Sequence, residues 1–234
     1  MQALPLPTTP VSVPVGAIAP GAQSMRKGFT LVELMVVIAI IGLLVSVLAT
    51  ATLPKMRKAS SEMDKIQMKD CYDELIRATI DEGTRKKLKM EHIAETKGHS
   101  FWEAMFKYKV LGREVLRRLV SKGGSDTAAD SRWLDDEGGR LAVDSCSWTS
   151  PRARNLFEVL GARGKDKAVV FSFNTRNWNN YPDAGVLVLF SETDVPEYVT
   201  PEILKDYGWE ISPEEWQNPS PLFGLKRPFD GTWE

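Results

Sequence analysis

A single carboxylate at the edge of a long uncharged segment is the first residue of this 234-residue chain whose chemistry needs an explanation. Glu33 directly precedes residues 34–54, none of which is charged. An acidic side chain at membrane depth costs about 2.5–3.5 kcal/mol on insertion scales unless it has a partner. If this segment lies in a membrane, Glu33 is therefore expected to pair with a cationic group.

Catalytic chemistry has little support elsewhere in the chain. His92 and His99 are the only histidines, and their spacing differs from the i, i+4 pair that binds a metal on one helix face. The sequence has no G-x-S-x-G motif, phosphate-binding loop or Cys/His metal cluster. We therefore expect a protein that is not an enzyme and that needs no cofactor.

One acidic stretch, residues 123–139, is a candidate calcium site. It contains Asp126, Asp130, Asp135 and Asp136, and calcium takes oxygen ligands of this kind from flexible loops. Their spacing does not match an EF-hand. An exposed acidic loop is the favoured interpretation, with calcium binding as the alternative.

The uncharged segment has the length of a membrane span. A helix over residues 29–53 extends ~37 Å, which crosses a ~30 Å hydrocarbon core with some tilt. Gly42, Ser46 and Thr50 recur every four residues, and such small residues suit close helix–helix contact in lipid. A buried core helix would need apolar neighbours on all sides, and a signal peptide has a shorter apolar region and a clear cleavage site. An uncleaved membrane anchor fits better than either.

The residues KGFTLVELMVVIAIIGLL, from Lys27 to Leu44, closely resemble the prepilin motif of type IV pilins and type II secretion pseudopilins. The resemblance implies that a prepilin peptidase cuts after Gly28 and that the new amino terminus, Phe29, is N-methylated. Glu33 is four residues after Phe29, so it could neutralise the new amine of its own chain. The resemblance implies instead that it pairs with the amine of a neighbouring subunit during assembly. Gly28 suits a cleavage site because it presents no side chain to obstruct the peptidase.

Four segments follow from the motif and the patterns around it. Residues 1–28 are the expected leader; translation from Met25 would make residues 1–24 a misassigned upstream segment, and a long leader is the alternative. Residues 29–53 are the predicted transmembrane helix, residues 54–82 an amphipathic continuation, and residues 83–234 a periplasmic globular head. The implied fold is α+β and pilin-like, with a long helical spine packed against a small antiparallel sheet.

Local patterns predict several elements of the soluble part. Apolar residues at largely helical spacing extend the first helix from about Phe29 to Asp81, with Gly83 ending it; these residues are Met63, Ile66, Leu75, Ile76 and Ile80. Ser100 and Glu103 have capping-box spacing before a helix whose aromatic residues are expected in the core. Residues 168–173 and 185–191 are β-rich. Residues 185–199 resemble the closing hairpin of a large pseudopilin-like family, with Glu192, Thr193 and Asp194 in place of the family's Asp-Gly turn.

Cys71 and Cys146 are the only cysteines, and both fall on the expected periplasmic side, where oxidation occurs. A bridge between them would tie the spine to the head and stabilise the fold by ~4 kcal/mol in the loop-entropy model. It requires Cα atoms within ~7 Å, which the sequence does not establish. The disulfide and two free thiols both remain open at this point.

The expected protein is a structural subunit of a type II secretion or type IV pilus-like filament. Its partners would be the prepilin peptidase, other pilin or pseudopilin subunits, an inner-membrane assembly platform and membrane lipid. It would cross a bacterial inner membrane once, with its N-terminus in the cytoplasm, and would be extracted into the filament. The formal net charge of −1 gives no basic field for nucleic acid.

Two rival interpretations remain. The first is a minor tip subunit whose head binds a secreted substrate, a surface or DNA, through exposed aromatic residues near Trp178 and Tyr181. The second is a membrane-anchored periplasmic enzyme, which would need a pocket with convergent polar groups.

Overall fold

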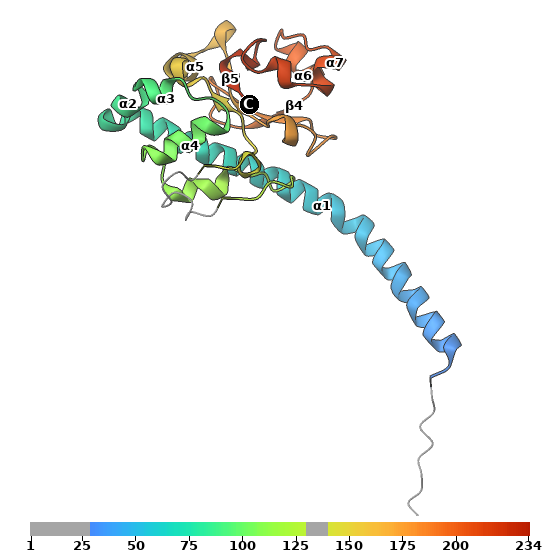
Figure 1. Ribbon diagram of the computed structural model, residues 1–234. Helices are drawn as coiled ribbons and strands as arrows, with labels where there is room; N and C mark the ends of the chain where they lie inside the picture. Colours follow the sequence, from blue (N-terminus) through green and yellow to red (C-terminus); the bar gives the residue numbers. More distant parts are fainter. Residues whose placement is uncertain (1–28, 130–139) are drawn as a thin grey trace, which may run out of the picture. The chain divides into compact units, whose positions relative to one another are not determined.

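A long helix, α1 (Leu31–Ile80), begins the computed structural model, which describes residues 29–129 and 140–234 (Figure 1). It runs through the boundary between two units, which lies between Ala49 and Thr50. The predicted helix from Phe29 to Asp81 is confirmed to within two residues at each end. Pro54 lies inside the helix and does not end it.

Within the second unit, one side of α1 is buried in the head. Its buried side chains are Asp64, Gln67, Met68, Cys71, Tyr72, Leu75 and Ala78. The predicted amphipathic helix would bury its apolar residues, but three of the five are exposed: Met63, Ile66 and Ile80 are 46%, 56% and 77% exposed. The buried stripe has regular helical spacing, but a carboxylate and an amide occupy two of its positions, so a pattern of apolar residues does not reveal it.

The spine helix α1 ends before Gly83, the residue predicted to terminate it. Helix α2 (Glu82–Leu88) begins directly after α1, and the carboxylate of Asp81 caps it by accepting a 2.7 Å hydrogen bond from the amide of Thr84. Gly83 therefore lies inside α2, and the prediction that it terminates the spine is wrong. A side-chain cap at Asp81 breaks the helix where the sequence suggested a left-handed glycine.

The next long helix of the head, α4 (His99–Lys107), also starts differently from the prediction. Its N-cap is Gly98, with a positive φ of 58° and no side-chain cap. Ser100 is therefore inside the helix, and the capping box with Glu103 does not form. The Glu103 carboxylate instead accepts hydrogen bonds from the Leu141 amide at 3.1 Å and from the Lys107 ammonium at 2.6 Å.

Short elements complete the head. The α-helices are α3 (Glu91–Ala94), α5 (Leu156–Gly161), α6 (Pro201–Asp206) and α7 (Pro213–Gln217). The 3₁₀ turns are η1 (Arg113–Arg118), η3 (Val143–Ser145), η4 (Ala153–Asn155), η5 (Gly164–Asp166), η6 (Thr175–Asn177), η7 (Ser220–Leu222) and η8 (Phe229–Gly231).

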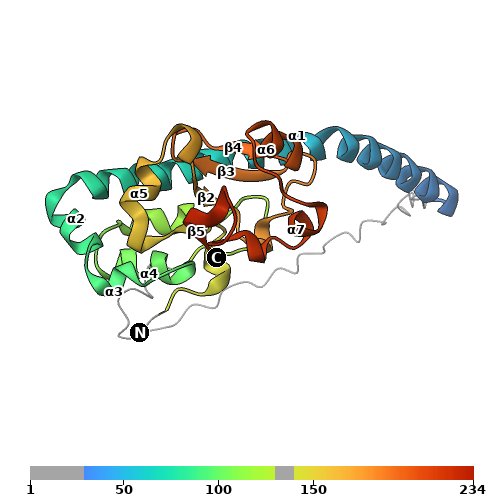
Figure 2. The same cartoon turned by 90° about the horizontal axis from the view of Figure 1, so that it is seen from above.

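A three-stranded antiparallel sheet, β2 (Val169–Ser172), β3 (Val186–Phe190) and β4 (Glu197–Val199), forms the centre of the head (Figure 2). A smaller sheet pairs β1 (Ser150–Pro151) with β5 (Thr232–Trp233). The two predicted strands are confirmed as β2 and β3, and β3 and β4 form the expected hairpin although no Asp-Gly turn joins them. Together with the long helix, the sheet confirms the α+β class.

Aromatic residues join the sheet to α1, to α4 and to the segment that follows α6. Phe171 of β2 packs against Tyr72 of α1 and Trp102 of α4, with ring centroids 6.5 and 5.2 Å apart. Phe190 of β3 stacks on Trp209 at 5.6 Å. Both strands are therefore buried along their whole length, which explains why they appear in the sequence as continuous apolar runs.

Candidate functional site

The amino-terminal turn of α1 contains Glu33, the predicted assembly residue. The Glu33 carboxylate accepts hydrogen bonds from the amide and the hydroxyl of Thr30, both at 2.8 Å. The Glu33 amide in turn donates to the Thr30 hydroxyl at 3.2 Å. These reciprocal bonds form a capping box, which satisfies helix donors that would otherwise lack partners.

This arrangement defines what Glu33 does in the single chain. Its carboxylate lies at the positive end of a long helix dipole and is bonded to its own Thr30. Phe29 precedes the helix and is 78% exposed. This cap was not among the features predicted from the sequence, although the spacing Thr-x-x-Glu is the signal that indicates it. Gly28 lies outside the described residues.

The apolar part of α1 has the properties of a membrane span. It is the one helix among the described residues that is long and apolar enough to cross a bilayer, with a mean hydropathy of 2.9 over 18 residues. Its large side chains are exposed, such as Leu43 at 65% and Leu44 at 63%. Exposure of so much apolar surface is unfavourable in water, so the segment fits a single-pass membrane anchor.

Residues 23–49 match the family model of the prokaryotic N-terminal methylation motif, the prepilin-type motif of type IV pilins and pseudopilins. No curated protein and no solved structure gives a significant match to the chain. The N-terminal segment is therefore a prepilin-type segment. This motif supports a type IV pilin-like or pseudopilin subunit, a class whose members are structural proteins.

A second polar site, buried in the head, was not predicted. Asp64 of α1 is 0% exposed and accepts hydrogen bonds from the Ser121 hydroxyl at 2.6 Å, the Lys122 amide at 2.6 Å and the Tyr181 hydroxyl at 2.9 Å. Burial raises the pKa of Asp64, and the donated hydrogen bonds oppose that shift. The cluster joins the spine to two loops of the head.

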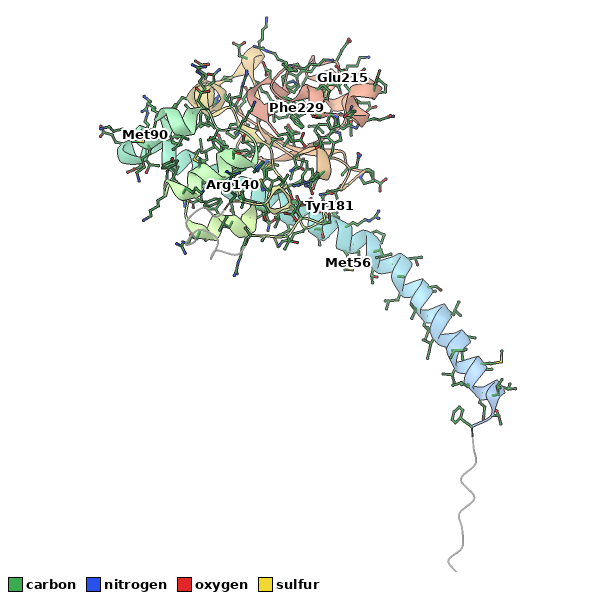
Figure 3. The ribbon with its side chains drawn as sticks, viewed as in Figure 1. Met56, Met90, Arg140, Tyr181, Glu215 and Phe229 are labelled. Atoms are coloured by element: carbon green, nitrogen blue, oxygen red, sulfur yellow. The ribbon has the colours of Figure 1, made fainter. Side chains whose placement is uncertain are left out.

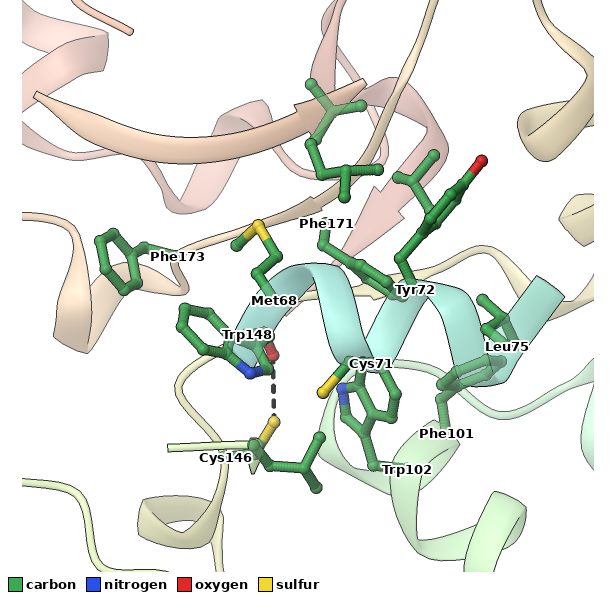
Figure 4. Close-up of a cluster of buried hydrophobic side chains, with 14 of the residues drawn as sticks. Met68, Cys71, Tyr72, Leu75, Phe101, Trp102, Cys146, Trp148, Phe171 and Phe173 are labelled. Carbon is green, nitrogen blue, oxygen red and sulfur yellow. Dashed lines mark hydrogen bonds between the residues drawn. The ribbon is translucent and has the colours of Figure 1, made fainter. Parts of the chain in front are cut away.

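Both cysteines lie in the hydrophobic cluster of the head (Figure 4). They are free thiols in this structure, so the disulfide considered above is not formed here. The Cys71 thiol donates to the Arg118 carbonyl at 3.5 Å, and the Cys146 thiol donates to the Trp148 carbonyl at 3.2 Å. Burial raises the pKa of both thiols, that of Cys146 to about 12, so neither is a reactive thiolate near neutral pH.

The calcium candidates are only partly within the described residues. Asp126 is described, and its carboxylate accepts hydrogen bonds from the Ser147 hydroxyl at 2.8 Å and the Asn177 amide at 2.7 Å. Asp130, Asp135 and Asp136 lie outside the described residues. Among the described residues, no group of three or more His, Cys, Asp or Glu side chains is placed to hold a metal ion.

The aromatic residues considered for a binding surface are buried. Trp178 is 1% exposed and packs against Trp216, Phe223 and Phe229 at centroid distances of 5.0–5.9 Å. Tyr181 is 6% exposed, with its hydroxyl bonded to Asp64. Neither residue therefore offers an exposed aromatic side chain to a partner, because the C-terminal segment covers Trp178 and the hydroxyl of Tyr181 is bonded to the spine helix.

Proposed function

We propose that this chain is a structural subunit, a pseudopilin or pilin-like protein, of a type II secretion or type IV pilus-like filament. In this proposal it is cut after Gly28 and N-methylated on Phe29. The observation that carries it is the prepilin-type motif at residues 23–49, placed at the start of a 50-residue helix with an exposed apolar segment.

The Glu33 carboxylate is the proposed assembly residue. Cleavage would convert Phe29 into a cationic terminus one residue before Thr30, and that cation needs a carboxylate wherever packing removes it from water. In the single chain the carboxylate is bonded to Thr30 of its own helix. During assembly, the amine of a neighbouring subunit would then form an ion pair with Glu33, whose carboxylate is already oriented by its bonds to Thr30 of the same helix.

The exposed face of α1 beyond the apolar segment supports packing between subunits. Met56, Met63 and Ile66 are 64%, 46% and 56% exposed. Their spacing of seven and three residues places them along one helix stripe, the pattern of a helix–helix seam. An apolar stripe of this kind gains stability when a second helix covers it.

The partners follow from the same proposal. They are a prepilin peptidase, other pilin-like subunits and an inner-membrane assembly platform, with the N-terminus in the cytoplasm and the head in the periplasm. The alternative of a tip subunit that binds substrate gains no support from Trp178 and Tyr181, which are buried.

Mass spectrometry of the chain extracted from membranes tests the proposal. Cells with an active prepilin peptidase should yield N-methyl-Phe29 as the first residue, and cells without the peptidase should retain the leader. Gly28→Leu should block cleavage, because a bulky side chain obstructs the cut site. Gly42→Leu places the same side chain inside the helix, where no neighbour lies within 4 Å, and should leave cleavage unchanged. An intact leader in peptidase-positive cells would exclude the assignment.

A further inference from the structure

A small pocket lies beside α1, just beyond the apolar segment, with an apolar lining and charged side chains among the residues around it. Its cavity volume is about 210 Å³, and Arg57 and Lys58 of α1 line it together with Asn180, Tyr181 and Asp183 from the loop before β3. Neither the prepilin motif nor the proposed assembly residue involves this pocket. Tyr181 is labelled in Figure 3.

The floor of the pocket is fixed by hydrogen bonds. The Tyr181 hydroxyl donates to the buried Asp64 carboxylate at 2.9 Å. The Asn180 amide donates to the Ser121 hydroxyl at 3.0 Å and to the Asn177 side-chain oxygen at 2.8 Å. These bonds hold the loop against α1, so the pocket is formed before any ligand binds.

The charges at the rim are of both signs. Arg57 and Lys58 supply two cations, and Asp183 supplies one carboxylate. In the described part of the chain, none of these three side chains belongs to an ion pair. They are therefore available to a ligand that itself carries both charges.

The position of Arg57 and Lys58 along α1 indicates the source of such a ligand. Leu53 is the last apolar residue of the uncharged segment, and Arg57 follows it by ~6 Å along a helix that rises ~1.5 Å per residue. The headgroup region on each side of a bilayer is ~5–8 Å thick outside the hydrocarbon core. When the apolar segment spans the membrane, Arg57 and Lys58 follow its last apolar residue within the length of the headgroup region, and both line the pocket.

We propose that this pocket binds a phospholipid headgroup that carries both a phosphate and a primary ammonium. Arg57 and Lys58 donate charge-assisted hydrogen bonds to the phosphate, and Asp183 accepts from the ammonium. A phosphocholine group has no N–H donor for Asp183, and an anionic phosphoglycerol group offers that carboxylate only neutral hydroxyls. Lipid binding at this pocket requires only that the helix spans the membrane. The tests of lipid binding and of filament assembly can therefore fail independently of each other.

Native mass spectrometry of the full chain in neutral detergent tests the proposal. The protein is offered an equal mixture of phosphatidylethanolamine, phosphatidylglycerol and phosphatidylcholine with identical acyl chains. We expect the ethanolamine lipid to be retained about tenfold over the other two, the size of one charge-assisted hydrogen bond. Arg57→Gln with Lys58→Gln should lower its retention by at least about tenfold, and Asp183→Asn should abolish the preference for it.

A matched variant controls for loss of charge. Arg154→Gln with Lys205→Gln removes the same pair of side-chain types from exposed positions elsewhere on the head, and it should retain lipid like the wild type. Excess phosphoethanolamine should displace the bound lipid, and inorganic phosphate should do so more weakly. Equal retention of the three lipids, equal displacement by inorganic phosphate, or unchanged retention in the Arg57/Lys58 variant would each overturn the proposal.

Discussion

Replacing Asp64 by alanine should destabilise the head more than any other removal of a charged side chain from α1. The carboxylate is fully buried and accepts three hydrogen bonds, from the Ser121 hydroxyl, the Lys122 amide and the Tyr181 hydroxyl. In Asp64→Ala the Ser121 hydroxyl can rotate toward another acceptor. The Lys122 amide and the Tyr181 hydroxyl lose their acceptor within the cluster.

The expected loss follows from these two donors. The buried Tyr181 hydroxyl costs ~1–3 kcal/mol when it is left without an acceptor, and the Lys122 amide, whose hydrogen bond is only partly buried, adds up to about 1 kcal/mol. Alanine recovers ~0.6 kcal/mol through its higher helix propensity, and removal of the carboxylate also relieves the cost of burying a charge, the cost that raises the pKa of Asp64. The free energy of unfolding should therefore fall by about 1–3 kcal/mol.

Urea denaturation of the full chain in neutral detergent, followed by tryptophan fluorescence, measures this loss. Asp70→Ala is the matched control on the same helix. The Asp70 side chain is 41% exposed and lies 3.6 Å from the Arg118 guanidinium, so its loss should cost less than ~1 kcal/mol. If both variants lose equally little stability, Asp64 does not organise the head and the reasoning is refuted.

A double-mutant cycle separates the Tyr181 contact from the rest. Tyr181→Phe should destabilise the wild type by ~1–2 kcal/mol, because it removes a hydrogen bond to a charged acceptor. In the Asp64→Ala background the same change should be neutral or stabilising, because it removes a donor that has lost its acceptor. If the stability losses of Asp64→Ala and Tyr181→Phe add up in the double mutant, the two side chains do not share a stabilising hydrogen bond.

Three further predictions concern titration, the thiols and assembly. Burial raises the pKa of Asp64 above its ordinary value of 3.8, so the folded state binds this proton more tightly than the unfolded state does. The unfolding free energy of the wild type, measured against Asp64→Asn, should therefore fall as the pH rises above 3.8 through the folded-state pKa; a flat difference would contradict the shift. Iodoacetamide at pH 8 should modify neither Cys71 nor Cys146 in the native protein, because both thiols are buried. It should modify both after denaturation without reductant. If the denatured protein is modified only when reductant is added, the two cysteines form a disulfide. The Glu33→Ala subunit should still be inserted and processed, but it should no longer give filament-sized crosslinked ladders, because removing one member of a buried charge pair costs ~3–5 kcal/mol. Glu62→Ala, which breaks an exposed i, i+3 ion pair, is the control. Ladders that persist in Glu33→Ala would exclude the assembly role.

Much of the amino-terminal site could be predicted from the sequence because its determinants are local. The uncharged segment, its length and the carboxylate at its start are contiguous, and the Thr30–Glu33 cap spans one helical turn. Strands β2 and β3 were also predictable, since continuous apolar runs mark strands that are buried on both faces.

The interior of the head depended on tertiary structure. An apolar pattern predicts burial from residue type, so it favoured Met63 and Ile66 and passed over Asp64. A carboxylate is tolerated in a core only where donors from distant segments meet it, and Ser121 and Tyr181 reach Asp64 only after the chain has folded. The same long-range folding buried Trp178 beneath the C-terminal segment and brought Asp183 beside Arg57, because each of these placements is set by packing between segments far apart in the chain.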